Sequence, residues 1–154
     1  MTFSILDFLQ DADATANIPW EIKKFTTGET IVKEGDEGQE VYFVKKGIVH
    51  VLVSMRLDQG LRKDKGIGKL SENEFFGELA VFNDNTRSAT VVAATDCEVI
   101  AIQGTALLDY LDENPAKGYQ ILRYFFEKIA HRMRSNNIRA NTIMELYLHE
   151  YTDE

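Results

Sequence analysis

Short runs of valine, isoleucine, tyrosine and phenylalanine recur between residues 25 and 102, and glycines separate the first of these runs. The separating glycines are Gly28, Gly35, Gly38 and Gly47. In the run 48–53 apolar residues occupy both alternating faces, which indicates a strand that is enclosed on both sides. Strands that recur at this spacing without a long helix between them predict an all-β barrel or jelly roll.

Other parts of this region carry different signals. Residues 3–10 have apolar side chains at helical spacing, and we expect a short amphipathic helix there. Residues 54–66 (SMRLDQGLRKDKG) are rich in charge and are predicted to form a loop, followed by a strand over 67–70. The stretch RSATVVAATDCEVIAI predicts two strands that turn near Thr95–Asp96.

The periodicity changes at Thr105. The segment 105–114 predicts a helix that ends before Pro115, and Asn114 followed by Pro115 is a favourable start for a second helix. The second helix continues without proline to about Tyr147 and carries a seam with heptad spacing. The seam consists of Leu122, Phe126, Ile129, Met133, Asn136, Ala140, Ile143 and Tyr147.

This seam has two interpretations. It can lie on the chain's own barrel, or it can pair with the same helix of a second copy. Because the helix is too long for so small a barrel to cover, we expect a mixture: the first turns pack on the barrel and the later turns form a homodimer. We expect the N-terminal helix and barrel to occupy residues 1–114 and the long helix residues 115–154, within one structural domain.

The composition restricts the class of protein. A chain of 154 residues and 17.5 kDa is expected to form one domain with one core. The single Cys97 excludes a disulfide framework or an iron–sulfur cluster, and we expect its thiol to be buried. The formal charge of −8 disfavours direct nucleic-acid binding. The histidines lie far apart and no nucleophile–base pair stands out, so we expect no metal site and no enzyme activity.

The localisation follows from three features of the sequence. The N-terminus lacks the basic region of a secretory signal, and no apolar run is long enough to span a bilayer. A lone thiol fits a reducing compartment. We therefore expect a soluble, cytoplasmic protein without a membrane partner.

The stretch GELAVFNDNTRSATV, residues 77–91, places an acid and a base around one glycine-led turn. Gly77 allows a close backbone approach, and ELAVF can form one helical turn whose free amides attract an anion. Arg87 can offer a planar fork to two phosphate oxygens, and Ser88 can add a hydroxyl. Glu78 can accept a hydrogen bond from a sugar hydroxyl, so the stretch favours a sugar phosphate. A structural salt bridge between Glu78 and Arg87 explains the same residue types equally well.

The segment FFGELAVFNDNTRSATVVA closely resembles the phosphate-binding cassette of cyclic nucleotide-binding domains, as found in catabolite activator proteins and kinase regulatory subunits. The resemblance extends upstream through FTTGETIVKEGDEGQEVYFVKKGIVHV and downstream through CEVIAI and the terminal helices. The resemblance therefore covers nearly the whole chain. The spacing between F-G-E-L-A and R-S-A-T-V is a specific signal of this family.

The resemblance implies a mainly β fold with flanking helices: a cyclic nucleotide-binding β-roll, or jelly roll, followed by a long C-terminal helix. It implies that the cassette amides and Arg87 bind the cyclic phosphate and that Glu78 binds the ribose 2′-hydroxyl. The further ligand contacts that it implies are Gly77, Leu79, Ala80 and Ser88. The resemblance therefore favours a sugar-phosphate site over a structural salt bridge between Glu78 and Arg87.

By the same resemblance, RSNNIRA matches the helix segment that contacts adenine in catabolite activator proteins. The matching positions there carry hydroxyl side chains, whereas this chain has Asn136 and Asn137. An amide can meet the adenine amino group and ring nitrogen together, so we expect these residues to contact the base. A polar residue in such a seam also fixes helix register, which is the alternative role for Asn136.

Catabolite-activator-type regulators continue into a helix-turn-helix domain, whereas this sequence stops a few residues after the seam. We therefore expect a cyclic mononucleotide sensor without its own DNA-reading domain, whose effector, if it has one, is a separate protein. We expect cAMP as the ligand, with cGMP as the second candidate because the Ser88 hydroxyl can also serve a guanine base. The alternative is a dimeric interaction module that keeps the cassette shape but binds no nucleotide.

Overall fold

The computed structural model describes residues 3–11, 16–57, 60–82 and 84–152. The chain divides into two compact units, with the boundary between Glu113 and Asn114. The first unit contains all the strands of the described residues and the shorter helices, and the second contains the long helix.

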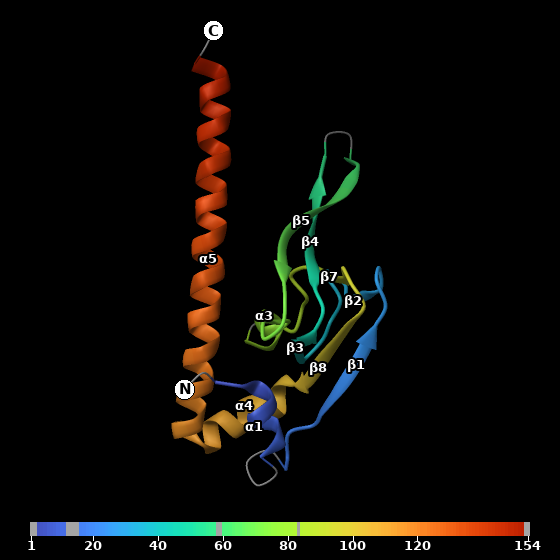
Figure 1. The fold of residues 1–154 in the computed structure, drawn as a ribbon, viewed down its shortest axis with the longest axis vertical. Helices are drawn as coiled ribbons and strands as arrows, with labels where there is room; N and C mark the ends of the chain where they lie inside the picture. The colour runs from blue at the N-terminus through green and yellow to red at the C-terminus, as the bar shows by residue number, and fades with distance from the viewer. Residues whose placement is uncertain (1–2, 12–15, 58–59, 83, 153–154) are drawn as a thin grey trace. The chain divides into compact units, whose positions relative to one another are not determined.

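The first unit is built from two four-stranded sheets in which all pairings are antiparallel (Figure 1). One sheet has the order β1 (Trp20–Phe25), β8 (Cys97–Gln103), β3 (Glu40–Lys46), β6 (Phe75–Phe76). The other has the order β2 (Thr30–Val32), β7 (Thr90–Ala93), β4 (Val49–Arg56), β5 (Arg62–Leu70). Apart from the β4–β5 hairpin, which lies within one sheet, consecutive strands alternate between the two sheets, as in a jelly roll, and the β-roll prediction is confirmed.

The core of the roll contains side chains from both sheets. Tyr42 and Val99 from the first sheet belong to the same buried cluster as Val49 and Val91 from the second. Cys97 is a member of this cluster, as expected, and burial raises the pKa of its thiol.

The other face of the first sheet is buried as well. Its register places Phe43 opposite Ile100, and both side chains are fully buried. The helices α1 (Ile5–Gln10) and α4 (Gly104–Glu113) meet through an edge-to-face contact between Phe8 and Tyr110, whose ring centres are 5.4 Å apart. The first sheet is therefore apolar on both faces, which explains why β3 and β8 are almost continuously hydrophobic.

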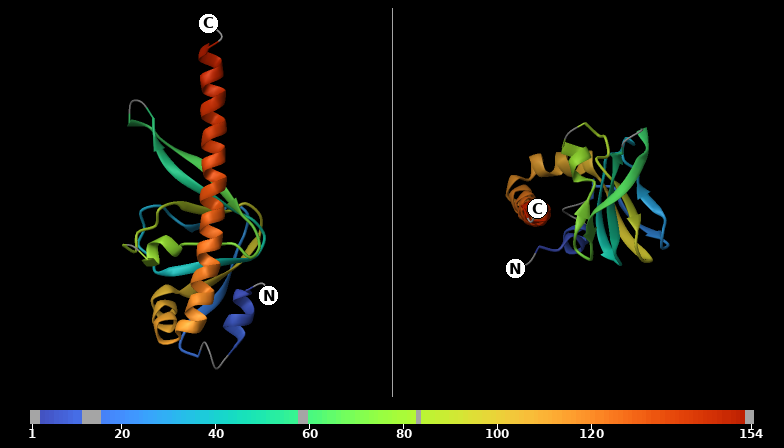
Figure 2. Two further views of the ribbon diagram at one scale, coloured as in Figure 1. Left: turned by 90° about the vertical axis from the view of Figure 1, so that its left-hand side faces the viewer. Right: turned by 90° about the horizontal axis from the view of Figure 1, so that it is seen from above.

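The prediction of a loop over residues 54–66 is wrong. Strand β4 continues to Arg56, and β5 begins at Arg62 and pairs with it along its length. The hairpin extends beyond the rest of the roll (Figure 1, Figure 2), and most side chains of β5 are exposed. Because this part of the hairpin has no buried face, its sequence needs no alternation of apolar and polar residues, and backbone pairing alone identifies the strand.

The second unit is the helix α5 (Pro115–Thr152), 38 residues long. At 1.5 Å per residue it spans about 57 Å. The long C-terminal helix predicted from the sequence is confirmed. Among its seam residues Leu122, Phe126 and Met133 are exposed, whereas the side chains of Ile143 and Tyr147 lie outside the described part of the structure. Across the described residues no helix is both long and apolar enough to cross a membrane.

Candidate ligand-binding site

The cassette begins where β6 ends. Gly77 has a φ of +82°, a left-handed conformation, and a Cβ at this position would lie 2.7 Å from Arg87 Nη1 and 2.9 Å from the Glu40 carbonyl oxygen. A residue with a side chain would therefore be strained and would also displace the arginine. The helix α3 (Glu78–Phe82) follows directly and forms the single turn predicted for ELAVF.

Arg87 is the buried cation of the cassette, with its side chain only 4% exposed. Its Nη1 donates hydrogen bonds to the carbonyl oxygens of Glu40 and Gly77, over 2.9 Å and 3.2 Å. Its Nη2 donates to the Glu40 carboxylate over 3.2 Å. The guanidinium carbon lies 5.5 Å from the centre of the Tyr42 ring, so the aromatic face adds a cation–π contact.

Backbone hydrogen bonds hold Arg87 in this position. Its amide donates to the Asp36 carbonyl and its carbonyl accepts from the Gly35 amide, each over 2.8 Å. The Gly38 amide donates to the Asn85 carbonyl over the same distance. A Cβ on Gly38 would overlap the Arg87 guanidinium, so the glycine forms one wall of the slot in which the arginine lies. The loop 33–39 thus fixes the backbone of Arg87 through hydrogen bonds and confines its guanidinium at Gly38.

The other residues predicted in the cassette differ in accessibility. Glu78 and Ala80 are buried, whereas Leu79 and Ser88 are exposed. The exposed Ser88 hydroxyl directly follows the buried Arg87, so these neighbours combine an accessible hydrogen-bond donor with a fixed positive charge.

Asn136 and Asn137 lie on α5, in the second unit, and both side chains are exposed. The cassette residues all belong to the first unit. The role of the two asparagines as base contacts stays a prediction.

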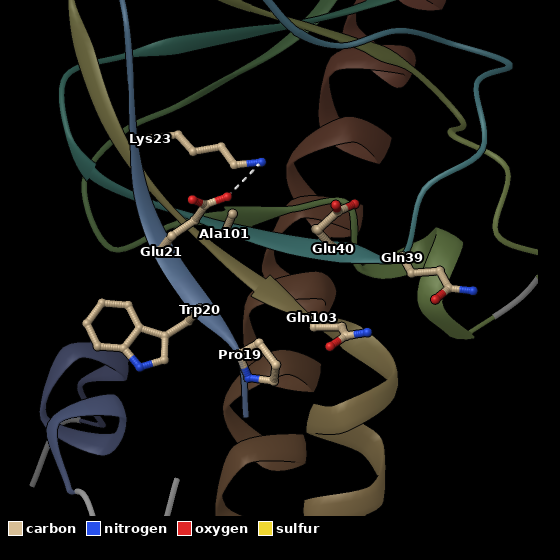
Figure 3. Close-up of a pocket in the computed structure, with 8 residues that line it drawn as sticks. All are labelled: Pro19, Trp20, Glu21, Lys23, Gln39, Glu40, Ala101 and Gln103. Carbon is tan, nitrogen blue, oxygen red and sulfur yellow. Dashed lines mark ion pairs between the residues drawn. The ribbon is translucent and has the colours of Figure 1, made fainter. Parts of the chain in front are cut away.

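A groove with a volume of about 430 Å³ lies on the roll beside Glu40. Figure 3 shows its lining, in which Lys23 from β1 and Glu40 from β3 flank Ala101 on β8. The Lys23 ammonium is 3.3 Å from the Glu21 carboxylate and 6.0 Å from the centre of the Tyr42 ring. Burial raises the pKa of Tyr42, and the negative charge of Glu40 raises it further.

The contacts of Arg87 with Glu40, Gly38 and Tyr42 were not predicted from the sequence. A glutamate at the start of the apolar run EVYFV was a weak signal of a charged partner near the core. The partner itself could not be identified, because the pairing depends on how the loop 33–39 folds back on the cassette. Among the described residues no three His, Cys, Asp or Glu side chains are grouped as metal ligands.

Residues 22–114 match the cyclic nucleotide-binding domain family. The chain belongs to this family. The match includes every cassette residue described above and most of the roll, and it excludes all of α5 from Pro115 onward. The family resemblance inferred from the cassette is therefore confirmed.

Two curated relatives and one solved structure indicate the range of the family. The cAMP-dependent protein kinase regulatory subunit of Colletotrichum orbiculare is 38% identical over 56% of this chain, which is 20% of the relative's length. The cGMP-dependent protein kinase of Eimeria tenella is also 38% identical, over 57% of this chain and 8% of its own length. This chain thus matches only a small part of both relatives. A cyclic nucleotide-binding domain from Methylobacillus flagellatus has the same fold, with a TM-score of 0.70, 22% identity and coverage of 78% of this chain and 65% of that one.

Proposed function

We propose that this chain is a sensor that binds a cyclic mononucleotide, with cAMP as its ligand, and performs no catalysis of its own. The observation that carries the proposal is the buried Arg87, whose orientation is fixed by Glu40, Gly77 and Tyr42 within a family-typical cassette. A buried guanidinium held by backbone carbonyls loses little conformational freedom when it binds an anion, and so it suits a phosphate.

The roles of the cassette residues follow from their chemistry. Arg87 and Ser88 bind the cyclic phosphate, through the guanidinium fork and a hydroxyl. Glu78 accepts a hydrogen bond from the ribose 2′-hydroxyl. The main chain at Gly77, together with Leu79 and Ala80, completes the contacts to the ribose phosphate.

The preference for cAMP rests on Asn136 and Asn137. A side-chain amide offers one donor and one acceptor, which complement the adenine amino group and its neighbouring ring nitrogen. The Ser88 hydroxyl can bond a guanine base in the syn form, and so cGMP is the second candidate. The name of one relative contains cAMP and that of the other contains cGMP, and titration with both nucleotides distinguishes the two candidates.

The proposal also includes a homodimer that forms through α5. Phe126 and Met133 are 73% and 62% exposed although they belong to one apolar seam. Pairing of two parallel helices would remove both side chains from water. A ligand that contacts the cassette and α5 together would shift the helix between positions, because differential contacts change populations. A separate effector protein, located with the sensor in the cytoplasm, would respond to that shift.

A thermal unfolding experiment with added nucleotide tests the proposal. Excess cAMP should raise the melting temperature, because a ligand that binds only the folded state stabilises it by mass action. AMP is the matched control, since it has the same base and sugar but lacks the cyclic phosphate. Unchanged melting at millimolar cAMP and cGMP would contradict nucleotide binding and would favour the ligand-independent interaction module.

A further inference from the structure

The guanidinium of Arg87 is already paired with an anion in this structure. That anion is the carboxylate of Glu40, which accepts a hydrogen bond from Nη2. The Arg87 side chain is 4% exposed, whereas the Glu40 side chain is 42% exposed. A cation buried so deeply requires a compensating charge, and Glu40 supplies it from the surface.

We propose that Glu40 sets the affinity of the cassette by competing with the cyclic phosphate for Arg87. This inference rests on the proposed function, because it assumes that Arg87 binds the phosphate. The ligand binds the fraction of molecules in which the carboxylate has left the arginine. The apparent affinity is therefore lower than the intrinsic affinity of the cassette.

The hydrogen-bond donors of Arg87 explain why the two anions compete. Nη1 has two N–H groups, and these donate to the carbonyl oxygens of Glu40 and Gly77. A phosphate that binds in a bidentate manner must therefore use Nη2 and Nε. One of the two N–H groups of Nη2 already donates to the Glu40 carboxylate, so a phosphate at Nη2 would bind directly beside it. A phosphate on that edge would bring two negative charges together at a buried site, which is unfavourable.

The released carboxylate can move into the groove beside it. Glu40 lines this groove together with Lys23, whose ammonium points across it (Figure 3). Lys23 currently pairs with Glu21, whose side chain is 67% exposed. The groove thus offers the Glu40 carboxylate both water and a nearby positive charge, so that its release costs little.

Arg87 would stay in place when the carboxylate leaves. The hydrogen bond from Arg87 Nη1 to the backbone carbonyl oxygen of Glu40 does not depend on the rotamer of the Glu40 side chain. The Gly77 carbonyl and the Tyr42 ring also remain. Glu40 thus holds the arginine with its backbone and blocks it with its side chain.

The variant Glu40→Gln separates these two roles. The amide has the size of the carboxylate and can still accept a hydrogen bond, but it carries no charge. Calorimetric titration of the full chain with cAMP should show binding that is roughly tenfold tighter, the effect of removing one charge-assisted hydrogen bond from the competing state. The matched control is Glu98→Gln, which removes the same charge from the same sheet but breaks the pair with Lys45, away from the groove. Its affinity should remain close to wild type.

The salt dependence of binding provides a readout that a purely structural role would not change. In the wild type the ligand exchanges one ion pair of Arg87 for another. In Glu40→Gln it creates an ion pair where none existed, so the affinity should fall more steeply as salt increases.

Tighter binding with a steeper salt dependence in Glu40→Gln, and in this variant alone, is the expected result. Unchanged or weaker binding in Glu40→Gln beside a wild type that binds cAMP would overturn the competition, as would an equal gain in Glu98→Gln. If the wild type and both variants bind no cyclic nucleotide, the proposed function fails, and the competition fails with it.

Discussion

Gly38 and Arg87 are so close that a single added methyl group on the glycine would overlap the guanidinium. The atoms that would be displaced belong to the end of a long side chain rather than to the backbone. The orientation of Arg87 therefore requires a glycine at position 38, whereas the fold itself could tolerate a larger residue there.

The substitution Gly38→Ala should therefore reduce ligand binding far more than stability. The new Cβ pushes the guanidinium out of its slot, and we expect cAMP affinity to fall by about tenfold or more through loss of a charge-assisted hydrogen bond. The melting temperature should change by only a few degrees, as is usual for a change of under about 1 kcal/mol. The control is Gly68→Ala, since a Cβ on Gly68 meets no atom within 4 Å. Equal affinities of the two variants would show that the slot does not orient the arginine.

The buried Glu78 should distinguish ribose from deoxyribose. The variant Glu78→Gln replaces a charged acceptor by a neutral one, and charge-assisted hydrogen bonds are roughly twice as strong as neutral ones. We expect the affinity for cAMP to fall while the affinity for 2′-deoxy-cAMP changes little. Titration of wild type and variant with both nucleotides measures this difference. An equal loss for both nucleotides would mean that Glu78 supports the cassette and does not contact the 2′-hydroxyl.

The exposed seam of α5 predicts that Met133→Glu disrupts a dimer. Two glutamates would face each other in an apolar interface, where buried like charges are strongly unfavourable. Sedimentation equilibrium should show a dimeric wild type and a monomeric variant. Ile138→Glu is the matched control, because Ile138 is 64% exposed, lies on the same helix and is not part of the seam. A wild type that is monomeric at micromolar concentration would contradict the dimer.

The two asparagines on α5 predict a change in base preference. Replacing Asn136 and Asn137 together by alanine should weaken cAMP binding more than cGMP binding, because the amide partners of adenine are lost. The ratio of the two affinities, measured by calorimetry, should move toward cGMP, while sedimentation still shows a dimer. A variant that keeps its preference for cAMP but dissociates into monomers would assign the asparagines to helix register.

The sequence alone predicted the parts of the structure that local patterns determine. Alternating apolar residues predicted β4, the turn near Thr95–Asp96 separated β7 from β8, and Asn114 with Pro115 marked the start of α5. The short turn α3 was predicted from Gly77 and the residues that follow it. Each of these elements is specified by neighbours in sequence, either through hydrophobic periodicity or through turn-forming residues.

Two features could not be predicted because they depend on contacts between distant segments. The strand β5 is exposed and charged, and only its pairing with β4 shows that it is a strand. The pairing of Arg87 with Glu40 joins the segment between α3 and β7 to the first residue of β3, and the loop 33–39 brings the two together. From the sequence, Glu78 was the candidate structural partner of Arg87, because only charged residues within the cassette could be related to the arginine.

The central claim is that Arg87 binds a cyclic phosphate, and a calorimetric titration of Arg87→Lys with cAMP tests it most directly. Lysine keeps the positive charge but cannot form the planar fork, and each charge-assisted hydrogen bond lost costs about 1.5–3 kcal/mol. We predict that the wild type binds cAMP and that the variant, shown by circular dichroism to be folded, binds at least tenfold more weakly. Wild-type affinity in Arg87→Lys, or a wild type that binds no cyclic nucleotide, would contradict the account.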